Sequence, residues 1–261
     1  MPPIVILHED ADQPALWLAE RLAAAGRAVE RFTGSDLARA RQWYHRLGRA
    51  AQTGHPVSGA VSRSVSRIVF ADGRTLGDVG ASGVINRLHY LPQAMLARLG
   101  GEDGDYARQE FHALLLSLLT ALPGPMFNRP TPQGLAGSWR HPSHWVAMAQ
   151  AAGLPVVDWR QRASDDPLAA WQAQPQPGER LTFALQSRLV DPLGLDASMA
   201  LDTAMAQACL ALGRASGCGL LGIRLAPDAA GIWRFVGAEV TPDYSLGGDA
   251  LVAALLEELP E

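Results

Sequence analysis

The sequence of 261 residues contains no lysine: all 22 of its basic residues are arginine. This absence excludes chemistry that needs a lysine amine, namely Schiff-base aldolases, pyridoxal enzymes with an internal aldimine and P-loop nucleotide hydrolases. Arginine does not take over that role, because the guanidinium cannot deprotonate near neutral pH. The chain is rich in Ala, Gly, Pro and Arg, so a compositional bias explains most of the absence, and the chemical exclusion holds either way.

Cysteine, net charge and long apolar runs are also scarce. Cys209 and Cys218 are too few for a disulfide framework, so the expected compartment is a reducing cytoplasm. The 26 acidic and 22 basic residues leave a net charge of −4, which argues against a nucleic-acid partner. The N-terminus lacks the basic start of a signal peptide. The longest apolar run, residues 113–122, is too short to span a bilayer, so no membrane partner is expected.

Hydrophobic periodicity predicts an α/β fold that opens with a doubly wound parallel sheet. Residues 4–7, 14–25 and 29–32 indicate a strand, a helix and a strand, without a glycine-rich dinucleotide motif. The remaining elements expected in the N-terminal half are a helix around 37–51, a hairpin at 62–76, a strand at 83–88, a helix at 106–122 and a strand edge at 126–130.

The C-terminal half is expected to be an α+β unit. Its predicted elements are a helix from 142 to a stop at 153, strands at 154–157, 181–189, 219–225 and 232–240, helices at 198–215 and 249–259, and a loop at 160–180. We place the domain boundary between residues 135 and 136.

Two asparagine–arginine pairs follow short predicted strands. Asn86 and Arg87 end one strand, and Asn128 and Arg129 end another. Carboxyl ends of strands line the ligand crevice of open α/β sheets, where arginine binds carboxylates or phosphates. These four residues are therefore candidate ligand contacts, with ordinary strand-end capping as the alternative.

A helix start carries a second group of candidates, Arg140, His141 and His144. Two histidines three residues apart share a helix face and suit a metal ion, but a third ligand nearby in the sequence is missing. Free amides and the positive dipole end of a helix favour an anion instead. Glu239, at the end of a strand, is a further candidate that could hold a divalent ion, although most carboxylates are solvated surface groups.

Taken in order, three stretches resemble the ATP-grasp superfamily, specifically carboxylate–amine ligases like the ribosomal protein S6 glutamate ligase. The first is residues 83–88 followed by a long helix and MFNRP at 126–130. The second, residues 138–156, contains AQAAGLPV. The third, residues 206–243, contains GLLGI and AEVTP and is the most specific of the three. The resemblance implies an N-terminal α/β domain and a closing α+β unit that together bind ATP and magnesium.

The sequence departs from the pattern that this resemblance implies. Lysines of the family's central subdomain contact the nucleotide, and this chain has none. Residues 157–205 are too few for a complete central subdomain. Three positions correspond to the family's magnesium ligands. Arg224 stands where an acidic residue is expected, Thr241 stands where an asparagine is expected, and only Glu239 matches. A fixed positive charge at residue 224 opposes a cation.

Three functions remain open. The first is a truncated, non-catalytic ATP-grasp relative that binds an anionic small molecule or a peptide, as an accessory to a partner enzyme or as a homo-oligomer, with Arg224 among its ligand contacts. The second is an active ATP-dependent carboxylate–amine ligase with magnesium, in which arginines hold the phosphates. The third is a metal-dependent α/β enzyme using His141 and His144.

Overall fold

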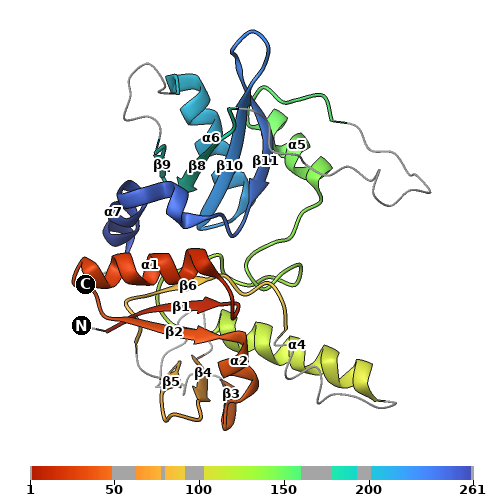
Figure 1. The fold of residues 1–261 in the computed structure, drawn as a ribbon. Coiled ribbons are helices and arrows are strands. Elements are labelled where there is room, and N and C mark those ends of the chain that lie inside the picture. Colours follow the sequence, from red (N-terminus) through yellow and green to blue (C-terminus); the bar gives the residue numbers. More distant parts are fainter. Residues whose placement is uncertain are drawn as a thin grey trace, which may run out of the picture. The chain divides into compact units, whose positions relative to one another are not determined.

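A computed structural model describes residues 2–48, 63–77, 80–91, 103–159, 178–192 and 201–259. The chain divides into two compact units, Met1–Gly137 with Leu259–Glu261, and Ser138–Glu258. Among these residues, the N-terminal unit contains a parallel and an antiparallel sheet, and the C-terminal unit contains one antiparallel sheet (Figure 1). Within the described ranges, every helix is too short or too polar to cross a lipid bilayer.

The N-terminal unit contains the predicted parallel sheet. Its strands are β1 (Ile4–His8), β2 (Val29–Thr33), β6 (Gly83–Asn86) and β7 (Met126–Phe127), in the order β2-β1-β6-β7 and all parallel. Helix α1 (Gln13–Ala24) lies along one face (Figure 1). It begins at Asp12, whose side chain accepts the amide of Ala15, and proline follows in the first turn.

A smaller antiparallel sheet follows in the same unit. It contains β3 (Gln42–Gly48), β4 (Arg63–Val69) and β5 (Thr75–Leu76), so the predicted hairpin over 62–76 is confirmed. The prediction of a helix over 37–51 is wrong: α2 is only Gly34–Ala38, and β3 comes next. Pairing with β4 overrides the helix-forming Ala, Leu and Arg of this segment. Helix α4 (Gly104–Thr120) packs against this region.

The C-terminal unit is the expected α+β structure. Strands β8 (Arg180–Leu185), β9 (Arg188–Val190), β10 (Leu220–Pro227) and β11 (Trp233–Glu239) form an antiparallel sheet in the order β11-β10-β8-β9. Helices α5 (Pro142–Ala151) and α6 (Thr203–Ser216) pack on it through a shared apolar core. The chain then forms a 3-10 turn, η1 (Tyr244–Gly247), and α7 (Gly248–Glu258).

Two predicted strands of this unit need correction. The single strand expected at 181–189 is the hairpin β8–β9, because Gln186 adopts a positive φ of 48° and turns the chain. The strand expected at 154–157 is one isolated parallel bridge between Val156 and Phe235. Most of the loop predicted at 160–180 lies outside the described residues.

Candidate functional site

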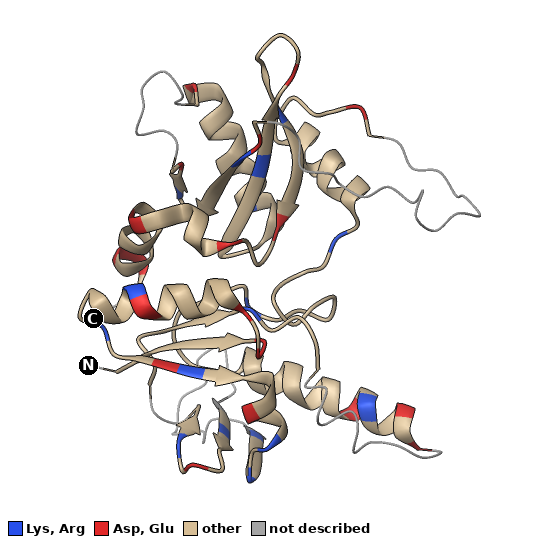
Figure 2. Cartoon of the chain, in the orientation of Figure 1, with Lys and Arg blue, Asp and Glu red and all other residues tan. Residues whose placement is uncertain are grey.

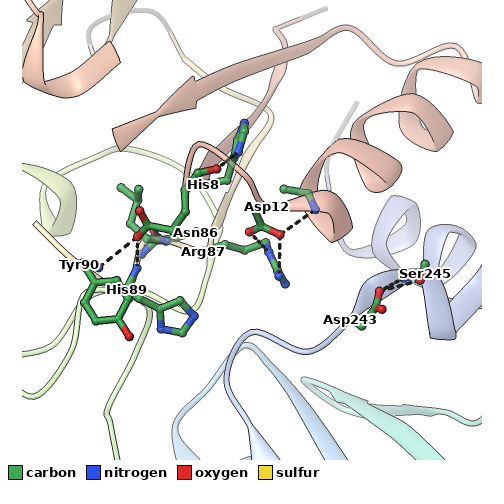
Figure 3. A network of polar contacts seen from close by, with 11 residues as sticks. His8, Asp12, Asn86, Arg87, His89, Tyr90, Asp243 and Ser245 are labelled. Carbon is green, nitrogen blue, oxygen red and sulfur yellow. Dashed lines mark hydrogen bonds and ion pairs between the residues drawn. The ribbon is translucent and has the colours of Figure 1, made fainter. Parts of the chain in front are cut away.

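Polar side chains gather at the carboxyl ends of β1 and β6 (Figure 3). Oε1 of Glu9, which directly follows β1, accepts the backbone amides of His89 at 2.9 Å and Tyr90 at 3.1 Å. Burial lowers the pKa of His89, and the neighbouring Arg87 guanidinium acts in the same direction, so the neutral imidazole is favoured. This is the crevice edge at which open α/β sheets place ligands.

Arg87, one of the predicted ligand contacts, forms a buried ion pair with Asp12. Its Nε and Nη2 donate to the two carboxylate oxygens at 2.6 and 3.0 Å, and the side chains are only 5% and 9% exposed. Asp12 also caps α1. Arg87 therefore ties the end of β6 to the start of α1.

The two predicted asparagines lie next to each other in the interior of the N-terminal unit. Asn86 is fully buried, and its amide donates to the carbonyls of Asn128 at 3.0 Å and Leu135 at 2.6 Å. Its Oδ1 accepts the amide of Leu88. Asn128 is also buried and has a positive φ of 57°, a conformation that asparagine tolerates better than most residues. The Asn86 side chain therefore holds the loop after β7 against β6.

Arg129 and Arg140 cap helix ends. Arg129 donates to the carbonyls of Thr120 at 2.7 Å and Gly124 at 3.1 Å, where α4 ends. Arg140 donates to the carbonyl of Ser216, the last residue of α6, at 2.8 Å. Its guanidinium also lies 5.0 Å from the centre of the Trp145 ring. Cationic side chains at these positions satisfy carbonyls that a helix leaves unpaired.

The two histidines of α5 have different surroundings. His141 is the N-cap of the helix, and its Nδ1 lies 2.8 Å from Oγ of Ser143, whereas His144 is exposed. In the described part of the chain, no three His, Cys, Asp or Glu side chains are grouped to hold a metal ion. The third ligand that a metal site at His141 and His144 requires is therefore not found among those residues.

The last two candidates meet in the C-terminal sheet. Arg224 on β10 forms a two-pronged ion pair with Glu179, in which Nη2 lies 2.9 Å from Oε2 and Nε contacts Oε1. Glu239, at the end of β11, lies 3.7 Å from the same Nε. The hydrogen bond that Arg224 donates to Glu179 raises the pKa of Arg224, so its positive charge is fixed between two carboxylates. The Arg224 side chain lies beside Gly237, where an added Cβ would be in ordinary van der Waals contact with it.

An apolar cavity of about 100 Å³ adjoins this cluster. Its walls include Trp145 of α5, Trp159, Phe235 of β11 and the side chain of Arg224. His141 packs edge-on against Trp159, with ring centres 5.9 Å apart. The cavity has room for one aliphatic side chain or a small ring.

Acidic and basic residues are interspersed in both units (Figure 2). Each of the four predicted arginines has an intramolecular partner: a carboxylate for Arg87 and Arg224, and backbone carbonyls for Arg129 and Arg140. Their role in ligand binding, like that of Asn86, Asn128, His141, His144 and Glu239, stays a prediction. The sequence interpretation missed the acidic partners of two of these arginines, Asp12 for Arg87 and Glu179 for Arg224. Asp12 carried a readable helix-cap signal before Pro14. Glu179 carried none, because its partner is 45 residues away.

Comparison with known proteins places this geometry in a known fold. No protein-family profile matches the chain, and no curated protein sequence matches it. Solved structures match the chain almost end to end. Macrocyclase MdnC of Microcystis aeruginosa MRC, bound with precursor peptide MdnA, has a TM-score of 0.64 and 12% identity, covering 99% of both chains.

The second is a RiPP-associated ATP-grasp ligase of Chryseobacterium gregarium, in complex with ADP and a leader and core peptide. It has a TM-score of 0.61 and 12% identity, covering 100% of this chain and 98% of the other. The ATP-grasp ligase PsnB, complexed with a minimal precursor, has a TM-score of 0.60 and 15% identity over 100% of both chains. Identities this low establish the fold alone. The chain thus has the ATP-grasp fold, as its sequence resemblance implied.

Proposed function

We propose that this protein is a non-catalytic member of the ATP-grasp fold that binds a peptide. The observation that carries the proposal is the ion cluster of Arg224, Glu179 and Glu239. Arg224 stands at a position where the resemblance implies an acidic magnesium ligand. Its guanidinium instead offsets one of the two negative charges of Glu179 and Glu239.

The residues at this position do not fit a magnesium ion. Mg²⁺ requires oxygen ligands in near-octahedral geometry, and a guanidinium 3.7 Å from Glu239 repels the ion that this carboxylate would bind. The asparagine that the resemblance implies is Thr241, and the chain has no lysine for the nucleotide.

A peptide is a better-supported ligand than a small anion. The arginines that would bind an anion already donate to Asp12, Glu179 and backbone carbonyls. The similar solved structures include complexes with a precursor peptide and with a leader and core peptide. The ATP-grasp fold therefore accommodates peptide ligands, and that part of its function does not depend on the missing metal ligands.

Calorimetric titration with ATP and MgCl₂ tests the non-catalytic half of the proposal. We expect no saturable heat of ATP binding. A titration that fits one-to-one binding of ATP would contradict the non-catalytic function. Selection of a displayed random peptide library on the immobilised folded protein tests the other half, with heat-unfolded protein as the control. Enrichment on the folded protein alone is expected, and equal recovery from both would contradict peptide binding.

A further inference from the structure

The outer edge of β2 presents backbone groups that a further strand can pair with. The parallel sheet ends at β2, and Ile4 donates its amide to Ala28 in a register that pairs Ile4 with Val29. Residues 28, 30 and 32 therefore direct their backbone groups toward β1, and Val29, Arg31 and Thr33 direct theirs outward.

Some of these outward groups are already occupied. The Arg31 carbonyl accepts Nη1 of Arg74 at 2.8 Å, and the Thr33 amide donates to Asp36 at 3.0 Å. Among the described residues, the Val29 carbonyl and the Arg31 amide have no partner. These two groups flank Glu30, and in a parallel ladder one residue of the neighbouring strand bonds to both of them. The edge thus offers one complete pairing position, opposite Glu30. The next position is blocked because the Arg31 carbonyl already accepts Arg74.

Recesses lie on both faces of this edge. On one face, a cavity of about 230 Å³ reaches Glu30 and Arg74 and is otherwise lined largely by apolar residues, among them Val5, Leu76 and Leu122. A second cavity of about 560 Å³ reaches the face of α1 and is lined by Val29, Arg31 and Thr33 together with Asp10 and Asp36. It shares Glu30 and Arg74 with the first cavity at the edge of the sheet. Because successive side chains of a strand point to opposite faces, an added strand would place them alternately in the two recesses.

The chemistry of the recesses defines the side chains that fit. The smaller recess suits an aliphatic residue opposite Glu30. The larger one has three carboxylates, Asp10, Glu30 and Asp36, against Arg31 and Arg74, and Arg74 is itself paired with Asp72 at 2.6 Å. A hydrogen bond from Ser35 lowers the pKa of Asp10, which keeps that carboxylate ionised. This recess therefore favours a cationic side chain.

We infer that an extended peptide segment with alternating aliphatic and cationic residues docks on the outer edge of β2 as an added parallel strand. Its central aliphatic residue lies opposite Glu30, donates its amide to the Val29 carbonyl and accepts the Arg31 amide. This site rests on the proposed peptide-binding function and gives it a location and a sequence preference. Strand addition is a known mode of peptide recognition, in which backbone bonds provide affinity and side-chain recesses provide specificity.

A fluorescein-labelled heptapeptide of alternating valine and lysine is the probe, read by fluorescence anisotropy. In this register the valine amides face β2 and the lysine amides face away. N-methylation of the valines should therefore weaken binding at least tenfold, whereas N-methylation of the lysines should leave it nearly unchanged. A peptide of the same composition with the valines and lysines in two blocks controls for charge attraction alone and should also bind at least tenfold more weakly.

Two protein variants test the same edge. Arg31→Pro removes the outward amide at an edge position that tolerates proline, and Arg31→Ala removes the same side chain but keeps the amide. We expect Arg31→Pro to bind the probe at least tenfold more weakly than Arg31→Ala, with circular dichroism as the folding check. If the proline variant does not fold, the comparison of the two N-methylated peptides tests the β2 site by itself.

Equal binding by the two N-methylated peptides, equal binding by the two folded variants, or no saturable binding by the wild type would overturn the β2 site. These results are distinguishable from failure of the proposed function. Selected peptides that bind Arg31→Pro and wild type equally would place the peptide site elsewhere. Turnover of ATP would refute the non-catalytic function and leave the β2 result unaffected.

Discussion

Nη2 of Arg224 lies 2.9 Å from Oε2 of Glu179, and this ion pair joins the middle of β10 to the residue before β8. Both side chains are mostly buried, with 19% and 16% exposure. A buried guanidinium with a two-pronged carboxylate partner is a fixed structural charge. In the proposed function, this fixed charge distinguishes the chain from solved structures of the same fold, one of which is a complex with ADP.

Replacing Arg224 by aspartate should create a cation site. The introduced carboxylate would join those of Glu179 and Glu239, and three carboxylates at one place suit Mg²⁺ or Ca²⁺. The Arg224→Asp variant should be less stable than wild type without metal and should regain stability with millimolar MgCl₂, because a ligand that binds only the folded state stabilises it. Thermal unfolding with and without MgCl₂ measures the effect.

Arg224→Gln is the matched control for that experiment. It removes the positive charge without adding a carboxylate, so its unfolding temperature should respond less to magnesium. If the aspartate and glutamine variants respond equally, the cluster is not a lost cation site.

The Arg87–Asp12 pair should be important for stability. Arg87→Ala leaves the Asp12 carboxylate buried without its partner, and such a loss lowers the free energy of unfolding by roughly 3–5 kcal/mol. Arg108→Ala removes an exposed partner of Asp105, with 40% and 87% exposure, and should cost less than about 1 kcal/mol. Urea unfolding of the two variants compares them. Equal, small effects would mean that Arg87 is available for another role.

Alkaline pH should destabilise the protein through Cys209. Burial raises the pKa of this thiol from 9.0 to about 12 in the folded state. Between these values the unfolded chain loses a proton that the folded protein keeps, so stability present below pH 9 is lost as pH rises toward 12. From pH 8.5 to 10.5 the loss should reach about 2 kcal/mol.

The absence of lysine makes this measurement unusually clean, because lysine amines normally titrate in the same range. Cys209→Ala should lose correspondingly less stability over that pH interval, while the four tyrosines and Cys218 are common to both proteins. Parallel pH profiles of the free energy of unfolding for wild type and variant would contradict the assignment.

The sequence predicted the elements whose signals are local. The buried run at β1, the apolar spacing of α1 and the alternating sequence of β11 were all readable because each depends on a few neighbouring residues. The helix predicted over 37–51 failed because its conformation is set by pairing of β3 with the distant β4. The turn within 181–189 failed because Gln186 adopts a conformation unusual for its residue type.

The candidate site was predictable in position and much less so in detail. Asn86, Arg87 and Asn128 were correctly expected at strand ends, since short apolar runs precede them. Their intramolecular partners depend on segments up to 75 residues away, which no local pattern encodes. Arg224 stood out only against the family pattern, and its pairing with Glu179 required the fold.

The most direct test of the central claim is release of phosphate from ATP by the purified protein with MgCl₂ and a mixture of carboxylates, amines and peptides. The ion cluster of Arg224 predicts release no faster than in the absence of protein. Release that rises in proportion to protein concentration and requires magnesium would contradict the account and establish magnesium-dependent turnover of ATP.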